Sequence, residues 1–193
     1  MRKYSIIVFA CVCLAACNNE SKENTTVDTD TTVNSQADLE ERGMNNAGGT
    51  ADAATADFLV KAADGGLAEV SAGQVAQSKA VNESVKLFAS MMISDHTAAN
   101  QQVKDFASRY GVALPSAASE EHQKKIDDVN KKEGKAFDKA YMSLMVDDHK
   151  KTIDLFKDAA GKAGNEEVKN FINNTIPKLQ LHLDSAQAIE KRL

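Results

Sequence analysis

The sequence has little cysteine, little proline and no tryptophan. Its 193 residues include three cysteines, two prolines and ten Phe or Tyr residues. The cysteines, Cys11, Cys13 and Cys17, all lie near the N-terminus, so no disulfide can crosslink the rest of the chain. Proline ends or kinks the interior of a helix, so its scarcity leaves room for long helices. These absences exclude a disulfide framework and favour a helical protein.

The sequence also lacks an excess of basic residues. It has 23 Lys and Arg against 28 Asp and Glu, a formal net charge of −5. Residues 18–53 hold eight acidic and two basic residues, a net charge of −6, so most of the imbalance lies there. Proteins that bind nucleic acids present a basic surface. We therefore expect no nucleic-acid partner.

The only long apolar run lies at the N-terminus. Arg2 and Lys3 precede it, and it covers residues 6–16. About eleven apolar residues are too few to span a bilayer and indicate a secretory signal peptide, residues 1–16. The run ends in LAAC, which resembles a bacterial lipobox with Cys17 as the lipidated residue. We expect a lipid anchor in the cell envelope, and Asn18 in place of aspartate favours the outer membrane, facing the periplasm.

The next segment, residues 17–53, differs in composition from the rest. It contains no aromatic residue and is rich in Asn, Thr and Asp. Such a segment buries too little apolar surface to offset chain entropy. We predict a disordered acidic tether behind the lipid, followed by a single domain over residues 54–193.

This domain carries apolar residues at helical spacings of three and four. Asn82 and Asn165 have the character of N-caps, and Gly111 that of a helix stop. The sequence predicts long helices over 54–80, 82–110, 133–160 and 165–191, and a short helix within 112–132, after Pro115. Short links after the first and third long helices predict an all-α, antiparallel four-helix bundle with an extra short helix in the central connection.

Two runs of the domain are near copies of each other. SMMISDHT at 90–97 and SLMVDDHK at 143–150 match at an offset of 53 residues. In each copy the histidine, His96 or His149, continues an apolar stripe of its helix. His122, in the charged run SEEHQKK, is expected in solvent.

The other two long helices also carry one inward ionisable residue each. His182 lies on the apolar seam of the last helix, and Glu69 interrupts a seam of small residues in the first. Counting about 1.5 Å per residue from the turns places Glu69, His96, His149 and His182 near the middle of the bundle. Buried without partners, these groups would cost several kcal/mol, so they should meet one another, water or a metal.

Two interpretations of this layer remain open. The first is a structural network of hydrogen-bonded core residues. The second is a transition-metal site for Cu, Zn or Fe, since imidazole and carboxylate ligands suit all three. Its candidate ligands are Glu69, His96, His149 and His182. Met92 and Met145, one turn before two of the histidines, are weaker candidates that would favour copper, and Asp95 and Asp148 are candidates for orienting a histidine of a neighbouring helix.

Four ordered motifs of the domain point to a known family. DFLVKAADGGLAEV (57–70), FASMMISDHTAAN (88–100), FDKAYMSLMVDDHKKTIDLF (137–156) and IPKLQLHLDSAQ (176–187) resemble the bacterial family called domain of unknown function 4142. The resemblance covers residues 54–191 and implies an exported protein, often a lipoprotein, with a ferritin-like four-helix bundle. The motif residues that it carries over are Glu69, Asp95, His96, His149 and His182.

The histidine positions differ from those of ferritin-like di-iron enzymes. Those sites need a Glu-x-x-His pair on two helices, but Ile93, Val146 and Leu179 stand three residues before the histidines here. No nucleophile with a catalytic motif occurs, so no catalytic residue is assigned. Two classes of function remain. We favour a non-enzymatic envelope lipoprotein that acts by interaction or in stress tolerance, and the alternative is a metal-binding or redox module.

Overall fold

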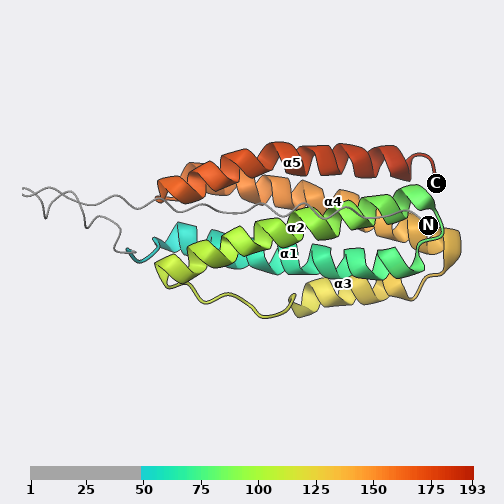
Figure 1. Cartoon of the computed structure of the whole chain (residues 1–193), viewed down its shortest axis with the longest axis horizontal. Coiled ribbons are helices and arrows are strands. Elements are labelled where there is room, and N and C mark those ends of the chain that lie inside the picture. The colour runs from blue at the N-terminus through green and yellow to red at the C-terminus, as the bar shows by residue number, and fades with distance from the viewer. Residues whose placement is uncertain (1–48) are drawn as a thin grey trace, which may run out of the picture. The chain divides into compact units, whose positions relative to one another are not determined.

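The protein is described by a computed structural model that covers residues 49–193. This part of the chain forms five α-helices and contains no strand. Every long helix begins and ends within two residues of its predicted position, so the all-α prediction is confirmed. The helices are α1 (Ala53–Lys79), α2 (Glu83–Tyr110), α3 (Glu120–Asn130), α4 (Gly134–Lys162) and α5 (Glu166–Glu190) (Figure 1).

The predicted signal peptide, the lipidation site Cys17 and the predicted tether up to residue 48 lie outside the described residues. The last tether residues are described, and Asp52 among them is the N-cap of α1, where it accepts hydrogen bonds from the Ala54 and Thr55 amides. Its other oxygen accepts from the Gly164 amide in the α4–α5 link. Among residues 49–193, no helix has both the length and the hydropathy needed to cross a membrane.

The four long helices form two hairpins, α1–α2 and α4–α5 (Figure 1). α1 also packs against α4, and α2 against α5, so α2 and α4 occupy diagonal corners of the bundle. α3 packs against α1 and α4 and carries the chain back along the bundle, which makes α2 and α4 run in the same direction. This arrangement confirms the predicted bundle of antiparallel neighbours with a short helix in its central connection.

Specific side chains fix the ends of the helices. Asn82 accepts a hydrogen bond from the Ser84 amide and Asn165 from the Val168 amide, as expected of N-caps. Gly111 ends α2 in the left-handed conformation, φ 69°, which favours glycine. Asp138 of α4 is fully buried and accepts from the Val81 and Asn82 amides. These contacts tie the α1–α2 turn to α4 and hold the two hairpins together.

The two repeated stripes form the centre of the core. Met92 and Met145, at equivalent positions of α2 and α4, are both fully buried. Phe88 and Tyr141, the equivalent pair before them, pack edge to face with ring centroids 6.3 Å apart. Equivalent positions therefore lie at equal heights on the two parallel helices. The same relation brings the two repeated histidines toward each other.

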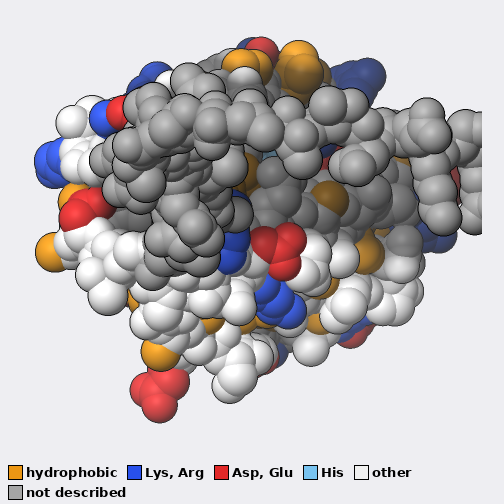
Figure 2. Space-filling view, turned by 60° about the vertical axis from the view of Figure 1, so that its left-hand side comes forward, with side chains coloured by type: hydrophobic (Ala, Val, Ile, Leu, Met, Phe, Trp, Pro, Cys, Tyr) orange, Lys and Arg blue, Asp and Glu red, His pale blue; other side chains and the backbone are white. Residues whose placement is uncertain are grey.

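The surface is mixed in character. On the part of the face in Figure 2 that grey atoms do not cover, acidic and basic side chains are interspersed, and no large area of one charge is visible. The exposed large apolar side chains among the described residues come from separate places along the chain: Val60, Val81, Leu87 and Leu181. Single exposed apolar residues of this kind are ordinary on a protein surface.

Candidate functional site

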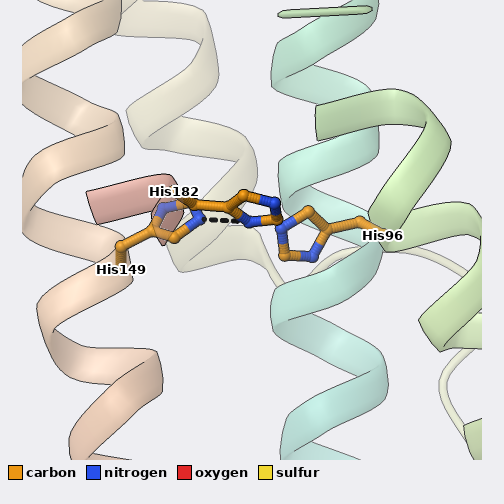
Figure 3. Close-up of side chains that lie close together, drawn as sticks. All are labelled: His96, His149 and His182. Carbon is orange, nitrogen blue, oxygen red and sulfur yellow. Dashed lines mark hydrogen bonds between the residues drawn. The ribbon is translucent and has the colours of Figure 1, made fainter. Parts of the chain in front are cut away.

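A polar layer crosses the middle of the apolar bundle. Each long helix contributes one member: Glu69 from α1, His96 from α2, His149 from α4 and His182 from α5. None of these residues is more than 6% exposed. The centroids of the three imidazole rings lie 5.4 to 5.6 Å apart (Figure 3). The structure thus brings together the four residues that the sequence placed at mid-bundle.

Glu69 and His96 form the closest pair of the layer. Oε2 of Glu69 lies 2.8 Å from Nδ1 of His96. A carboxylate can only accept, so Nδ1 carries the hydrogen of this contact. The other ring nitrogen of His96, Nε2, is buried and has no hydrogen-bond partner among the described residues.

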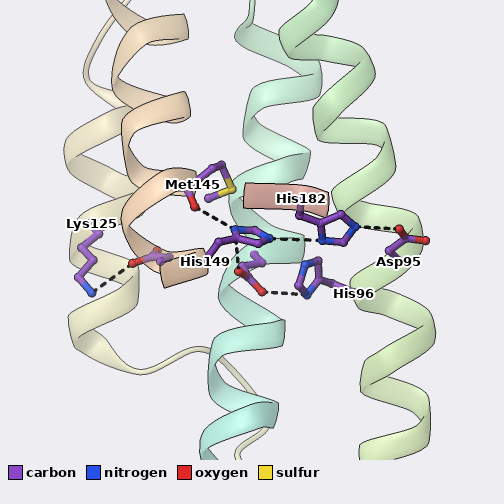
Figure 4. A network of polar contacts seen from close by, with 8 residues as sticks. Asp95, His96, Lys125, Met145, His149 and His182 are labelled. Carbon is purple, nitrogen blue, oxygen red and sulfur yellow. Dashed lines mark hydrogen bonds and ion pairs between the residues drawn. The ribbon is translucent and has the colours of Figure 1, made fainter. Parts of the chain in front are cut away.

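His149 is oriented by its own helix. Its Nδ1 lies 2.9 Å from the carbonyl oxygen of Met145, one turn earlier in α4 (Figure 4). A carbonyl only accepts, so Nδ1 is the protonated nitrogen in the neutral ring and Nε2 bears the lone pair. Oε1 of Glu69 lies 3.4 Å from the same Nδ1 and makes no hydrogen bond of its own, because the hydrogen is directed to Met145.

His182 is oriented by the neighbouring helix. Its Nε2 lies 3.0 Å from Oδ2 of Asp95 in α2 (Figure 4). The second oxygen of Asp95 lies 3.5 Å from Nζ of Lys178. Asp95 therefore holds the hydrogen of His182 on Nε2 and leaves the lone pair on Nδ1. The predicted contact between Asp95 and a histidine of a neighbouring helix is present in the structure.

The free nitrogens of the three rings converge. Nε2 of His149 faces Nδ1 of His182 at 3.4 Å, the contact that is dashed in Figure 3. In neutral rings each of these two nitrogens carries a lone pair and no hydrogen, so no hydrogen bond can form between them. One ring nitrogen of each of the three histidines lies within 4.8 Å of the other two. The layer therefore has an acceptor on the outer side of every ring and a group of nitrogens at its centre.

Burial and the carboxylate set the charges of the layer. Burial lowers the pKa of His149 below its ordinary value, and it lowers that of His182 to about 4 in spite of the Asp95 hydrogen bond. Burial also acts against a charge on His96, but the attraction and hydrogen bond of Glu69 outweigh it and raise this pKa. Burial would raise the pKa of Glu69, but the histidines, His96 foremost, lower it to about 2. Two imidazoles are thus neutral at pH 7.

The other predicted site residues lie around this layer. Asp148, the repeat equivalent of Asp95, points toward α3, with its carboxylate 3.8 Å from Nζ of Lys125. Met92 and Met145 are buried in the core, and Met145 acts on His149 through its carbonyl oxygen. The sequence pattern gave no signal for that carbonyl contact, because a main-chain acceptor leaves no trace in residue type.

His122 differs from its prediction. Its side chain is only 23% exposed, and its Nδ1 is buried 3.6 Å from the Asp64 carboxylate. The expectation of a solvated side chain was wrong because α3, the helix that contains His122, packs against α1 and places this side chain beside Asp64 of α1. His122 is not among the three histidines whose nitrogens converge.

A small cavity adjoins the layer. Its volume is about 40 Å³, and His96 and His182 form part of its wall. Most of the remaining wall area is apolar. The acidic residues Glu69 and Asp95 also line it, as do the exposed Lys61 and Lys178. Gly66 leaves room here for Asn100, whose side chain a Cβ at position 66 would overlap.

Comparison with solved structures identifies a relative of this fold. A crystal structure of a DUF305 fragment from Deinococcus radiodurans matches with a TM-score of 0.67 and 12% sequence identity. The match covers 75% of this chain and 99% of that chain. At this identity the likeness establishes the helical fold. No curated protein matches the sequence.

Comparison with family models gives a match over most of the chain. The model described as "Domain of unknown function (DUF4142)" matches residues 40–189. This range contains all four members of the polar layer and Asp95, the residues that the motif resemblance carried over. The chain belongs to the domain of unknown function 4142 family.

Proposed function

We propose that this protein is a metal-binding module of the cell envelope, in which His96, His149 and His182 hold one first-row transition-metal ion. The observation that carries the proposal is the 3.4 Å distance between Nε2 of His149 and Nδ1 of His182. In neutral rings both of these nitrogens carry a lone pair. Lone pairs at this distance repel unless a cation lies between them. Two nitrogens bound tetrahedrally to one ion, each at about 2.0–2.1 Å, are roughly 3.3–3.5 Å apart.

The acceptors around the layer support the same proposal. In histidine ligands the second ring N–H generally donates a hydrogen bond to a carboxylate or carbonyl group. This contact fixes the ring and makes the other nitrogen a stronger metal ligand. Glu69, the Met145 carbonyl and Asp95 provide these three acceptors. Nε2 of His96, which has no hydrogen-bond partner among the described residues, is the third metal-binding nitrogen of the proposal. The three nitrogens lie within 4.8 Å of one another, so a movement of the His96 side chain by about 1.3–1.5 Å would bring it to ligand spacing from the other two.

Glu69, a candidate metal ligand in the sequence analysis, has a different role in this proposal. We propose it as the hydrogen-bond acceptor of His96 and as the countercharge of the ion, because its contacts are to Nδ1 atoms on the outer side of the rings. His96 would lose a proton when an ion binds, since metal ligands must be neutral imidazoles. Imidazole donors suit Zn, Cu and Fe, and the bound ion would provide Lewis-acid or redox chemistry according to its identity.

We favour metal binding over the interaction module because the exposed large apolar side chains of the described residues come from separate places along the chain. The uncovered part of the face in Figure 2 has mixed charges.

The envelope location in this proposal rests on the N-terminal apolar run and on Cys17. A Cys17→Ala variant should lose incorporation of labelled fatty acid, and full incorporation by that variant would contradict the lipid anchor.

The metal proposal is tested by loading the full chain in mild detergent. After removal of metals by a chelator, the protein is dialysed against Zn²⁺, Cu²⁺ or Co²⁺ and its metal content is measured by mass spectrometry. We expect one ion per chain. His149→Gln and His182→Gln should abolish uptake, while far-UV circular dichroism shows that the helices persist.

A matched control uses the histidine outside the layer. His122→Gln removes an imidazole that does not contact the other three, so its metal content should equal that of the unmodified chain. Equal loss in all three variants would indicate adventitious binding by histidine, and no uptake by the unmodified chain would disprove the proposal.

A further inference from the structure

The cavity beside the layer borders two of the three rings. His96 and His182 border it from the inside, and the exposed ends of Lys61 and Lys178 border it on the outside. Ala62 of α1 and Ala99 of α2, both small, also line it. The cavity thus connects the surface with two of the three rings of the cluster, and His149 lies behind them.

The number of protein donors makes this position chemically relevant. Structural zinc sites are closed by four protein ligands, whereas sites with three protein ligands keep a position for an exogenous one. Three histidine nitrogens converge here, and the described residues place no further His, Cys, Asp or Glu atom in the same group. A fourth donor can therefore enter by way of the cavity.

The volume of the cavity limits what can enter. A water molecule needs roughly 10–15 Å³ on this measure, so about 40 Å³ holds two or three waters or a ligand of two or three non-hydrogen atoms. A larger anion, such as a carboxylate attached to a ring, would have to keep most of its atoms outside the entrance. Apolar atoms make up most of the wall, and Asn100, Thr152 and Thr175 add polar groups to it.

The charges around the cavity select the sign of the ligand. Three neutral imidazoles and a divalent ion carry +2, and ionised Glu69 reduces this to +1. Asp95 adds no net charge because Lys178 lies 3.5 Å from it. A net positive charge in a buried apolar site is unfavourable. One monoanion would neutralise it.

We propose that the cavity walled by Ala62, Ala99, His96 and His182 binds a monoanion of two or three non-hydrogen atoms, which completes the ligand set of the three-histidine centre. This inference rests on the proposed function. It adds a class of ligand, an entrance and a size limit.

The test uses the full chain loaded with Co²⁺, whose visible spectrum reports changes in its ligands. Azide, a triatomic monoanion, is the probe, and benzoate is the oversized anion. We expect azide to change the spectrum saturably with one equivalent per cobalt, and benzoate to leave it unchanged. Cobalt content is measured separately in every sample.

Two matched variants show whether the cavity is the route. Ala99→Leu fills the wall, whereas Ala98→Leu makes the same change on the exposed neighbouring position of α2. Ala99→Leu should bind cobalt normally but weaken azide binding by roughly tenfold or more, because added methylene groups occupy the ligand's space. Ala98→Leu should bind azide as the unmodified chain does.

The outcomes separate the two proposals. If the chain takes up cobalt but azide leaves the spectrum unchanged, the monoanion site is disproved and metal binding stands. Equal azide affinity in Ala99→Leu and Ala98→Leu would also disprove it, since the ligand would then enter elsewhere. If the chain takes up no cobalt, both proposals fail.

Discussion

The two repeated runs, 90–97 in α2 and 143–150 in α4, share a sequence pattern but have different surroundings. Their histidines lie at the same height on parallel helices and face the same centre. Their aspartates diverge: Asp95 contacts His182 of α5, whereas Asp148 faces Lys125 of α3. A repeated sequence therefore fixes the inward residue, and the neighbouring helix decides what the residue beside it does.

The largest expected effect comes from the one carboxylate near both repeated histidines. Glu69→Ala should lower the free energy of unfolding by roughly 3 kcal/mol, because it leaves buried Nδ1 of His96 without its ionised acceptor. Chemical denaturation of the metal-free chain at pH 7 measures this. Glu133→Ala, which removes an exposed carboxylate paired with Lys79, should cost at most about 1 kcal/mol. Equal losses would show that Glu69 is not central to the layer.

The pH dependence of stability distinguishes the two histidines of the repeat. The lowered pKa of His149 and His182 means that the unfolded chain binds their protons first, so stability should fall as pH decreases from about 6.5 toward 4. Each such group contributes a slope of up to about 1.4 kcal/mol per pH unit. The raised pKa of His96 acts the other way, and its contribution is lost as pH rises through that value.

Denaturation curves of metal-free variants at several pH values test this difference. His149→Gln should reduce the loss of stability on the acid side of pH 6.5, and His96→Gln should reduce the loss on the alkaline side. Identical pH profiles for the two variants would contradict opposite pKa shifts at equivalent positions.

The aspartates should differ in their effect on metal affinity. Asp95→Asn weakens the acceptor that holds the His182 hydrogen on Nε2, and changes of this kind reduce metal affinity about 10–100-fold. Asp148→Asn, the equivalent change in α4, should leave the affinity as it is, because Asp148 faces α3. Competition titration with a chromophoric chelator measures both. A similar loss in the two variants would mean that the repeat is functionally symmetric.

The smallest expected effect is that of the cation facing Asp148. Lys125→Ala should change the free energy of unfolding by less than about 1 kcal/mol, since the ion pair is long, 3.8 Å, and partly exposed. Thermal denaturation followed by circular dichroism is sufficient to detect a larger loss. A loss comparable to that of Glu69→Ala would place Asp148 and Lys125 in the polar layer after all.

Much of the fold followed from local patterns. Asn82, Gly111 and Asn165 mark helix ends through their own side chains or conformation, so they were readable one at a time. The heights of Glu69 and His182 followed from counting residues along rigid helices. Short-range geometry of this kind is contained in the sequence itself.

The details of the site depended on contacts between helices. No spacing rule indicates that Asp95 and His182, 87 residues apart, form a hydrogen bond. Nor does the sequence distinguish Asp95 from Asp148, since both precede a histidine in the same pattern. The path of α3 makes the difference, because α3 packs against α4, on the side where Asp148 lies, and among the described residues α2 has no such helix beside Asp95.

The distribution of acceptors between the two hairpins bears on how the bundle assembles. The α1–α2 hairpin contains both carboxylates that contact histidines of the layer, Glu69 and Asp95, and can provide the acceptor for Nδ1 of His96 by itself. The α4–α5 hairpin contains two histidines and no carboxylate that contacts them, so His182 finds its acceptor only when the hairpins dock. Docking of the second hairpin and completion of the polar layer are therefore one cooperative step. Before docking, the α1–α2 hairpin has an acceptor for its histidine of the layer, whereas the α4–α5 hairpin lacks one for His182.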